Sequence, residues 1–292
     1  MYRMMHRLTW LLLATSVVAG GDVTYVQEVV NSGVGSQKRG ARRTVHEIQI
    51  KGARQRVSTD IEAPKDVVRT LQKQGVILQG TKILLLDQGR LYDIDREAST
   101  YRQQTLPAPT PKPAPATPGA TLGGAAKPAA PVEPKDREIT VRTKVLADTT
   151  RIAGILCHRV AAEMTARHFK PGTTTVERIN RFLYQAWMAD GFPAYAELLA
   201  FRRRQEQQTS LAPLVGGGLD QLADAVEDPD RLATELAALQ GFPMQSELKV
   251  FTTVGKAKER ELLSLSSRVL RLSQESLPES LFQPSRELKP VP

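Results

Sequence analysis

The sequence predicts an α+β fold: a curved antiparallel β-sheet, an unclosed half-barrel, with a helical lid inserted between two late strands. Segments with alternating β-branched residues recur along the chain, whereas helical periodicity is concentrated at 193–240. The tripeptide Gly-Phe-Pro stands at both ends of that stretch, at 191–193 and 241–243. Proline suits a helix's first turn, and glycine followed by proline is typical of a helix end. These observations indicate a helical excursion from a sheet.

The first part of the sheet is expected over residues 21–106. Alternating or apolar runs predict strands at 23–30, 42–51, 53–59, 82–86, 90–94 and 95–101. The run Ile83–Leu86 is apolar on both faces, which indicates a central strand. A weaker pattern predicts a short helix around 65–74.

Residues 107–135 form a Pro/Ala-rich segment with too little apolar surface to fold, so we expect a disordered insertion. A solvated linker and a partner-docking segment are both compatible with that composition. Residues 136–292 are expected to complete the same sheet, with the lid at 193–240. Strands are predicted at 137–147, at 157–164, from Arg178 through the aromatic run that ends at Trp187, at 244–252 and at 262–272, giving about ten in all. Leu281 and Phe282 are expected to pack the tail against the sheet.

The N-terminus has the pattern of a signal peptide over residues 1–20. Arg3 and Arg7 precede an apolar run at 8–18 that is too short to span a bilayer, and cleavage is expected near Ala19. A retained anchor is the alternative. The signal predicts a periplasmic or secreted protein. The single cysteine of the 292-residue chain excludes an internal disulfide, although that compartment would allow one.

Basic residues gather in two clusters within a chain of net charge +9. They are candidates for contact with an anionic membrane surface. The favourable position of arginines at a helix C-terminus is a purely structural explanation for the second cluster. Export and the lack of interleaved aromatic residues disfavour nucleic acid as a partner. The clusters comprise Lys38, Arg39, Arg42 and Arg43, and then Arg202, Arg203 and Arg204.

A group of large apolar residues gathers around the two Gly-Phe-Pro junctions. One interpretation is an ordinary core between sheet and helix. The other is a cleft that admits a lipid or a lipoprotein acyl chain. The candidate cleft residues are Trp187, Phe192, Tyr195, Leu198, Leu199, Phe201, Phe242 and Met244.

Motifs for catalysis, metals and cofactors are not found in the sequence. Cys157 and His158 are adjacent, but neighbours on a strand point to opposite faces and cannot form a dyad. No cysteine pair or His-Glu-x-x-His motif suggests a metal site. We therefore expect a protein without catalytic residues or cofactor.

The order of several short landmarks resembles the bacterial domain-of-unknown-function family 4412. This family is in turn similar to the lipoprotein-carrier class (LolA and LolB like), which implies a curved sheet, a helical lid and an apolar cavity. The proline-rich insertion departs from that pattern. The landmarks are Gly89 to Tyr92, Tyr101, Ile152, Gly154, Cys157, Trp187, Phe192-Pro193, Leu239, Gly241-Phe242-Pro243, Leu281-Phe282 and Pro284.

The leading hypothesis is a non-enzymatic periplasmic protein that binds an apolar or amphiphilic ligand between sheet and lid. The alternative is a cell-envelope interaction protein with a filled core that docks on a protein or an anionic surface. A cavity of a few hundred cubic ångströms would favour the first. The sequence does not indicate an oligomeric state.

Overall fold

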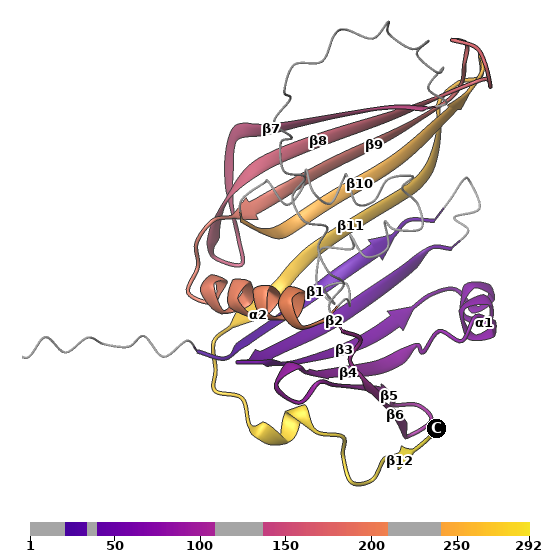
Figure 1. The fold of residues 1–292 in the computed structure, drawn as a ribbon. Helices are drawn as coiled ribbons and strands as arrows, with labels where there is room; N and C mark the ends of the chain where they lie inside the picture. The colour runs from indigo at the N-terminus through magenta and orange to yellow at the C-terminus, as the bar shows by residue number, and fades with distance from the viewer. Residues whose placement is uncertain (1–20, 34–39, 109–136, 210–240) are drawn as a thin grey trace, which may run out of the picture.

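A computed structural model describes residues 21–33, 40–108, 137–209 and 241–292 (Figure 1). These residues form a single curved, unclosed sheet of twelve strands with two α-helices, α1 (Lys65–Lys73) and α2 (Tyr195–Gln208). The prediction of an α+β fold with an open sheet is confirmed at this level. The predicted signal peptide, most of the proline-rich insertion and the second half of the predicted helical stretch lie outside the described residues. Neither described helix is long and apolar enough to cross a membrane.

Neighbours in the sheet are mostly neighbours in the sequence, and β11 pairs with β1. The sheet is unclosed because its edge strands, β7 and β12, do not pair with each other. Its order is β12-β6-β5-β4-β3-β2-β1-β11-β10-β9-β8-β7, and every neighbouring pair is antiparallel except β12 beside β6. The first strand pairs with the eleventh, with Thr24 opposite Ser273, so the two sides of the proline-rich insertion belong to one sheet. The strands are β1 (Val23–Asn31), β2 (Arg42–Lys51), β3 (Arg54–Glu62), β4 (Gln79–Leu85), β5 (Arg90–Asp95), β6 (Thr100–Thr105), β7 (Arg137–Ile152), β8 (Ile155–Phe169), β9 (Val176–Ala189), β10 (Phe242–Val254), β11 (Arg260–Ser273) and β12 (Lys289–Pro290).

We call the face of the sheet against which α2 packs the inner face. Alternation places Tyr25 of β1, Ile48 of β2 and Val57 of β3 side by side on it, all at most 5% exposed. Leu248 of β10 and Tyr184 of β9 continue this face on the other side of β11. The alternation that predicts these strands therefore produces one broad, mainly apolar surface.

The C-terminal tail covers the outer face of β3, β4 and β5. The short 3₁₀ helix η3 (Glu279–Phe282) buries Phe282 completely in a cluster with Ile83 and Tyr92. Leu84, next to Ile83, points to the inner face and is also fully buried. The predictions of a tail packed on the sheet and of a central strand with two apolar faces are both confirmed.

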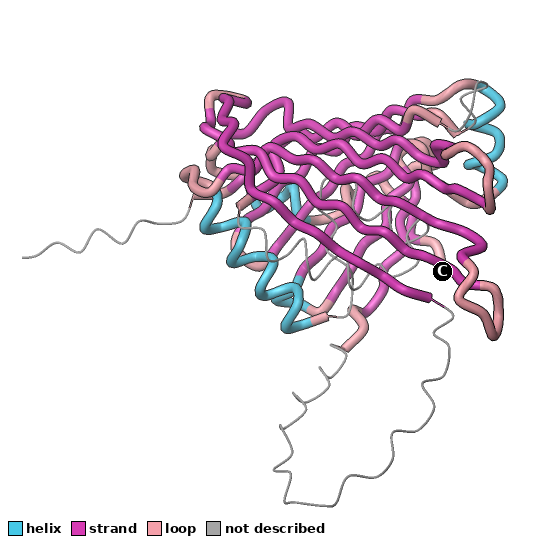
Figure 2. The backbone as a smooth tube through the Cα atoms, turned by 90° about the horizontal axis from the view of Figure 1, so that it is seen from above, coloured by secondary structure: helices cyan, strands magenta, loops and turns pink. Residues whose placement is uncertain are grey.

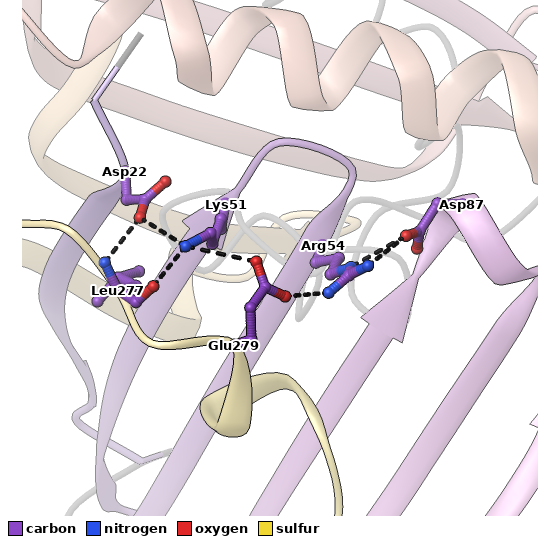
Figure 3. A network of polar contacts seen from close by, with 6 residues as sticks. All are labelled: Asp22, Lys51, Arg54, Asp87, Leu277 and Glu279. Carbon is purple, nitrogen blue, oxygen red and sulfur yellow. Dashed lines mark hydrogen bonds and ion pairs between the residues drawn. The ribbon is translucent and has the colours of Figure 1, made fainter. Parts of the chain in front are cut away.

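A chain of ion pairs fastens this tail at the start of the sheet (Figure 3). Asp22 accepts a hydrogen bond from the Leu277 N–H at 2.7 Å, and Lys51 Nζ donates to the Leu277 carbonyl at 2.6 Å. Exposed ion pairs contribute little to stability individually, so this series of ion pairs mainly fixes the position at which the C-terminal tail crosses β2 and β3. It runs through Asp22, Lys51, Glu279, Arg54 and Asp87.

The predicted strand over 95–101 is wrong in its bounds. The Asp95 side chain accepts a hydrogen bond from the Ala98 N–H at 2.9 Å, and Ser99 adopts a positive φ, so a turn intervenes. The next strand, β6, begins only at Thr100. Aspartate favours such turns because its side chain replaces a backbone acceptor. The short β12 has no counterpart among the predicted strands.

Candidate functional site

The helix α2 packs on the inner face at the end of the sheet where β1 begins and β2 ends. Leu198, Phe201 and Gln205 follow helical spacing and are the buried residues of this helix. Arg204 donates a hydrogen bond to the Gly52 carbonyl in the β2–β3 turn at 2.8 Å. Figure 2 shows α1 and α2 at opposite ends of the strands. The contact of α2 with the sheet is thus mainly apolar.

Four aromatic rings connect α2 to the sheet. Tyr25 meets Phe242 edge-on at 5.5 Å, Phe242 meets Phe192 at 5.8 Å, and Phe192 meets Tyr195 at 5.5 Å. The first two are edge-to-face contacts, which stabilise by about 1 kcal/mol each beyond area burial. The two Gly-Phe-Pro junctions, which are distant in sequence, therefore meet through their phenylalanines.

The two junctions differ in what their residues do. Gly241 has a φ of +111°, and a Cβ there would lie 3.0 Å from the Ala189 carbonyl, so this position requires glycine. Pro243 lies at the start of β10, where the ladder has a bulge and tolerates a missing N–H. Pro193 precedes α2, and the N–H of Tyr195 bonds to the Phe192 carbonyl at 2.9 Å.

A cleft lies between α2 and the sheet, but it is small. Its volume is about 30 Å³, which holds a water-sized group and not an acyl chain. Ligand pockets commonly measure hundreds of cubic ångströms. The structure is therefore closed at this position. The cleft is lined by Tyr25, Ile50, Gln55, Tyr195, Leu198, Leu199, Phe201, Arg202, Gln205, Gly241 and Phe242.

Two polar atoms lining this cleft are buried without a hydrogen-bond partner: the Tyr25 hydroxyl and Gln55 Oε1. Tyr25 is fully buried and Gln55 is 1% exposed. Burial raises the pKa of Tyr25 far above its usual value, and the charge of Arg202 partly opposes that shift. Leaving such groups unpaired costs about 1–3 kcal/mol each. Buried polar atoms usually have a partner, so this pair requires an explanation, such as a bound ligand group or an ordered water.

The structure brings most of the predicted apolar residues together. Phe192 and Phe242 join through their rings, while Tyr195, Leu198, Leu199 and Phe201 line the cleft from α2. Trp187 does not line the cleft: it is half-buried, packs against the same core cluster and lies under the Arg159 guanidinium at 5.9 Å. Met244 is completely buried in the surrounding core.

Sequence analysis missed the polar half of the cleft. Tyr25 and Gln55 belong to strands whose alternation was visible, so their inward direction was predictable. Their meeting beneath α2 was not, because it depends on a helix more than a hundred residues away in the sequence.

Further polar residues occupy the middle of the inner face. Ser246 and Ser267 share a hydrogen bond of 2.8 Å across β10 and β11, and the Tyr184 hydroxyl bonds to Ser246. His46 Nδ1 lies 3.0 Å from the Thr59 hydroxyl across β2 and β3. The inner face is therefore apolar with a satisfied polar stripe, and His46 is an interior residue with a partner.

The predicted basic residues do not form one surface. Arg42 and Arg43 begin β2, whereas α2 packs near its other end. Arg43 forms ion pairs with Glu28 and with Glu62, the latter at 3.0 Å. Within the second cluster, Arg203 is exposed, Arg202 lines the cleft and Arg204 bonds to the β2–β3 turn. Lys38 and Arg39 lie outside the described residues.

Cys157 and His158 have separate environments. Burial raises the pKa of the Cys157 thiol, whose Sγ contacts the Ile155 carbonyl at 3.4 Å. His158 Nδ1 instead lies 3.0 Å from the carboxylate of Asp190. A buried thiol with a raised pKa is a poor nucleophile. In the described part of the chain, no three metal-ligating side chains form a group.

A larger hollow of about 570 Å³ lies at the far ends of β8, β9 and β10. It is open to solvent, and charged side chains are part of its wall, so it does not provide an enclosed apolar site. Its lining residues are His168, Phe169, Pro171, Glu177, Arg178 and Val254.

Comparison with known proteins gives no family for this chain. A scan against protein-family models finds no match, and a search of curated proteins finds no significant match. The resemblance to the domain-of-unknown-function family 4412 stays a prediction that rests on the order of its landmarks.

Proposed function

We propose that this protein is a non-enzymatic, exported binding protein that holds an amphiphilic, lipid-like ligand on the inner face of its sheet, with α2 as a movable lid. The observation that carries this proposal is the pair of unpartnered polar atoms, Tyr25 Oη and Gln55 Oε1, inside an otherwise mainly apolar cleft. A ligand with both a polar and an apolar part would satisfy both kinds of wall.

The size of the cleft requires α2 to move before such a ligand enters. Leu198 and Phe201 attach the helix to the sheet by apolar contact, worth about 1.5–3 kcal/mol for each side chain fully buried. An acyl chain offers the sheet the same kind of contact. The ligand therefore replaces part of the apolar contact that α2 makes with the sheet. This new contact partly offsets the free energy needed to displace the helix.

The charges near the cleft favour a particular end of the ligand. Tyr25 offers a hydroxyl donor, and Arg202 provides a positive charge close enough to act on its pKa. A head group that accepts a hydrogen bond from Tyr25 and donates one to Gln55 Oε1, such as a protonated carboxylic acid or a phosphate monoester, satisfies both unpartnered atoms. We place the head group at Tyr25 and the chain along the apolar inner face.

Export follows from the N-terminal pattern and agrees with a role in handling lipids outside the cytoplasm. The intact mass of protein purified from its host should show that residues up to about Ala19 have been removed. A full-length mass would contradict this part of the proposal.

The experiment that tests binding is titration of detergent-free protein with a fluorescent fatty acid. We expect saturable binding that unlabelled fatty acid displaces. Leu199→Lys should weaken it, because Leu199 lines the cleft without being fully buried. Leu270→Lys is the matched control, since Leu270 is 46% exposed and lies outside the cleft. Absence of binding to the wild-type protein, or equal loss in both variants, would refute the proposal.

The alternative is an envelope interaction protein whose core is simply filled. The cleft volume of about 30 Å³ is the observation in its favour. It predicts that the protein binds no fatty acid and that Leu199→Lys and Leu270→Lys behave alike. The same titration therefore separates the two functions.

A further inference from the structure

The two edges of the sheet differ in length and in whether another strand pairs with them. At one edge, the C-terminal strand β12 pairs with β6, and Arg102 of β6 donates to the Pro292 carbonyl at 2.8 Å. At the other edge lies β7, a strand of 16 residues. Among the described residues, no strand pairs with the backbone edge of β7 that faces away from β8. A long open edge is a template for pairing with another strand.

The first nine residues of β7, Arg137–Val145, lack proline and, after Arg137, inward-pointing charges, two of the features that usually prevent such pairing. Their other charges, among them Arg142 and Lys144, lie on the other face. The ladder to β8 stays in register until a bulge after Val145. The side chains on the inner side are Ile139, Val141, Thr143 and Val145, and Val145 is 63% exposed. Natural edges are commonly blocked by proline, bulges or inward-pointing charges.

We propose that this edge pairs antiparallel with β7 of a second copy of the chain, about a two-fold axis at Val141. In this register Glu138 lies opposite Lys144 twice, once on each side of the axis. Ile139 lies opposite Thr143, and Val141 meets its own copy. Opposite charges in directly facing positions stabilise antiparallel pairs. The inner faces of both copies then lie on the same side of one continuous sheet.

The charges of β7 disfavour the neighbouring registers toward its C-terminal end. An axis at residue 142 or 144 places Arg142 or Lys144 against its own copy, and an axis at 143 places Arg142 against Lys144 twice. Like charges directly opposite are destabilising. An axis at 140 pairs Glu138 with Arg142 but uses a shorter part of the edge. Among the registers that stay within Arg137–Val145, before the bulge, the one about Val141 is the longest without such repulsion.

The chain's own preceding segment is a poor occupant of this edge. Residues 109–136 contain eight prolines, which cannot donate to a ladder, and the proline-free stretch 119–127 consists mainly of glycine and alanine, which are depleted in strands. A second copy of β7 offers an uninterrupted set of donors and acceptors.

The test is sedimentation equilibrium of the full mature chain over a wide range of concentration. We expect a monomer–dimer equilibrium for the wild type. Lys144→Glu replaces two attractive pairs by two repulsive ones and should raise the dissociation constant about tenfold or more. Glu138→Lys should act similarly, although Glu138 also contacts Arg167 of β8 at 3.4 Å. The double variant Glu138→Lys/Lys144→Glu should restore the dimer.

Arg142→Gln is the control, because Arg142 faces Thr140 in the proposed register and a glutamine places no like charge opposite Glu163 of β8. It should change the dissociation constant much less than Lys144→Glu. Glu138, Arg142 and Lys144 are exposed, so the melting temperature of each variant should stay close to that of the wild type. A wild type that stays monomeric, a dimer indifferent to Lys144→Glu, or a double variant that fails to associate would overturn the proposal.

Discussion

Replacing Tyr25 by phenylalanine separates a binding role of its hydroxyl from a structural one. The ring is fully buried against Phe242, and the hydroxyl has no hydrogen-bond partner. Phenylalanine keeps the ring contact and removes an unsatisfied group whose burial costs about 1–3 kcal/mol. We therefore expect Tyr25→Phe to leave the free energy of unfolding unchanged or to raise it by about 1 kcal/mol. Binding of a fatty acid should weaken at the same time.

Tyr184→Phe is the control, because Tyr184 is also buried on the inner face but bonds to Ser246. It should lower the free energy of unfolding by about 1 kcal/mol and leave binding unchanged. Urea unfolding followed by circular dichroism gives the stabilities, and titration with a fluorescent fatty acid gives the affinities. If Tyr25→Phe destabilises as much as Tyr184→Phe and binds normally, the hydroxyl has a structural partner and the reasoning is refuted.

Three further predictions concern stability. Gly241→Ala should cost roughly 1–3 kcal/mol in urea unfolding, because φ is +111° and a backbone carbonyl lies 3.0 Å from the new Cβ; an unchanged midpoint would contradict this. Phe282→Ala should cost about 3–5 kcal/mol, since Phe282 is fully buried, whereas Glu279→Gln should cost under about 1; equal losses would show that the ion pairs hold the tail. Burial raises the pKa of Tyr184 to about 12 from 10.0, so the unfolded state binds fewer protons than the folded one between these values. Stability should therefore fall as pH rises above 10, and a flat profile of melting temperature would contradict this.

Local structure was largely readable from the sequence. The strand predicted over 42–51 has these bounds in the structure, and the helix predicted around 65–74 is α1. The break between the strands predicted at 82–86 and 90–94 is the 3₁₀ helix η1 (Leu86–Gln88). These elements depend on alternation, helical spacing and turn residues within a few positions, which is the information a single sequence contains.

Long-range pairing was not readable in the same way. The contact of β1 with β11 joins residues more than two hundred positions apart, and no local pattern specifies that partner. Trp187 packs against the core without lining the cleft, at a position next to a bulge in β10. The volume beneath α2 depends on how Leu198, Phe201 and Tyr25 fill the space together, and composition does not determine that.

Native mass spectrometry of protein purified without added lipid from its host's membrane fraction tests the central claim most directly. If α2 covers a lipid-binding face, part of the protein should carry a non-covalent adduct with the mass of an acyl lipid. The Tyr25→Phe variant, purified in parallel, should carry less of it. A wild-type protein that is free of any adduct and also takes up no fatty acid would contradict the account and leave a closed, filled core as its replacement.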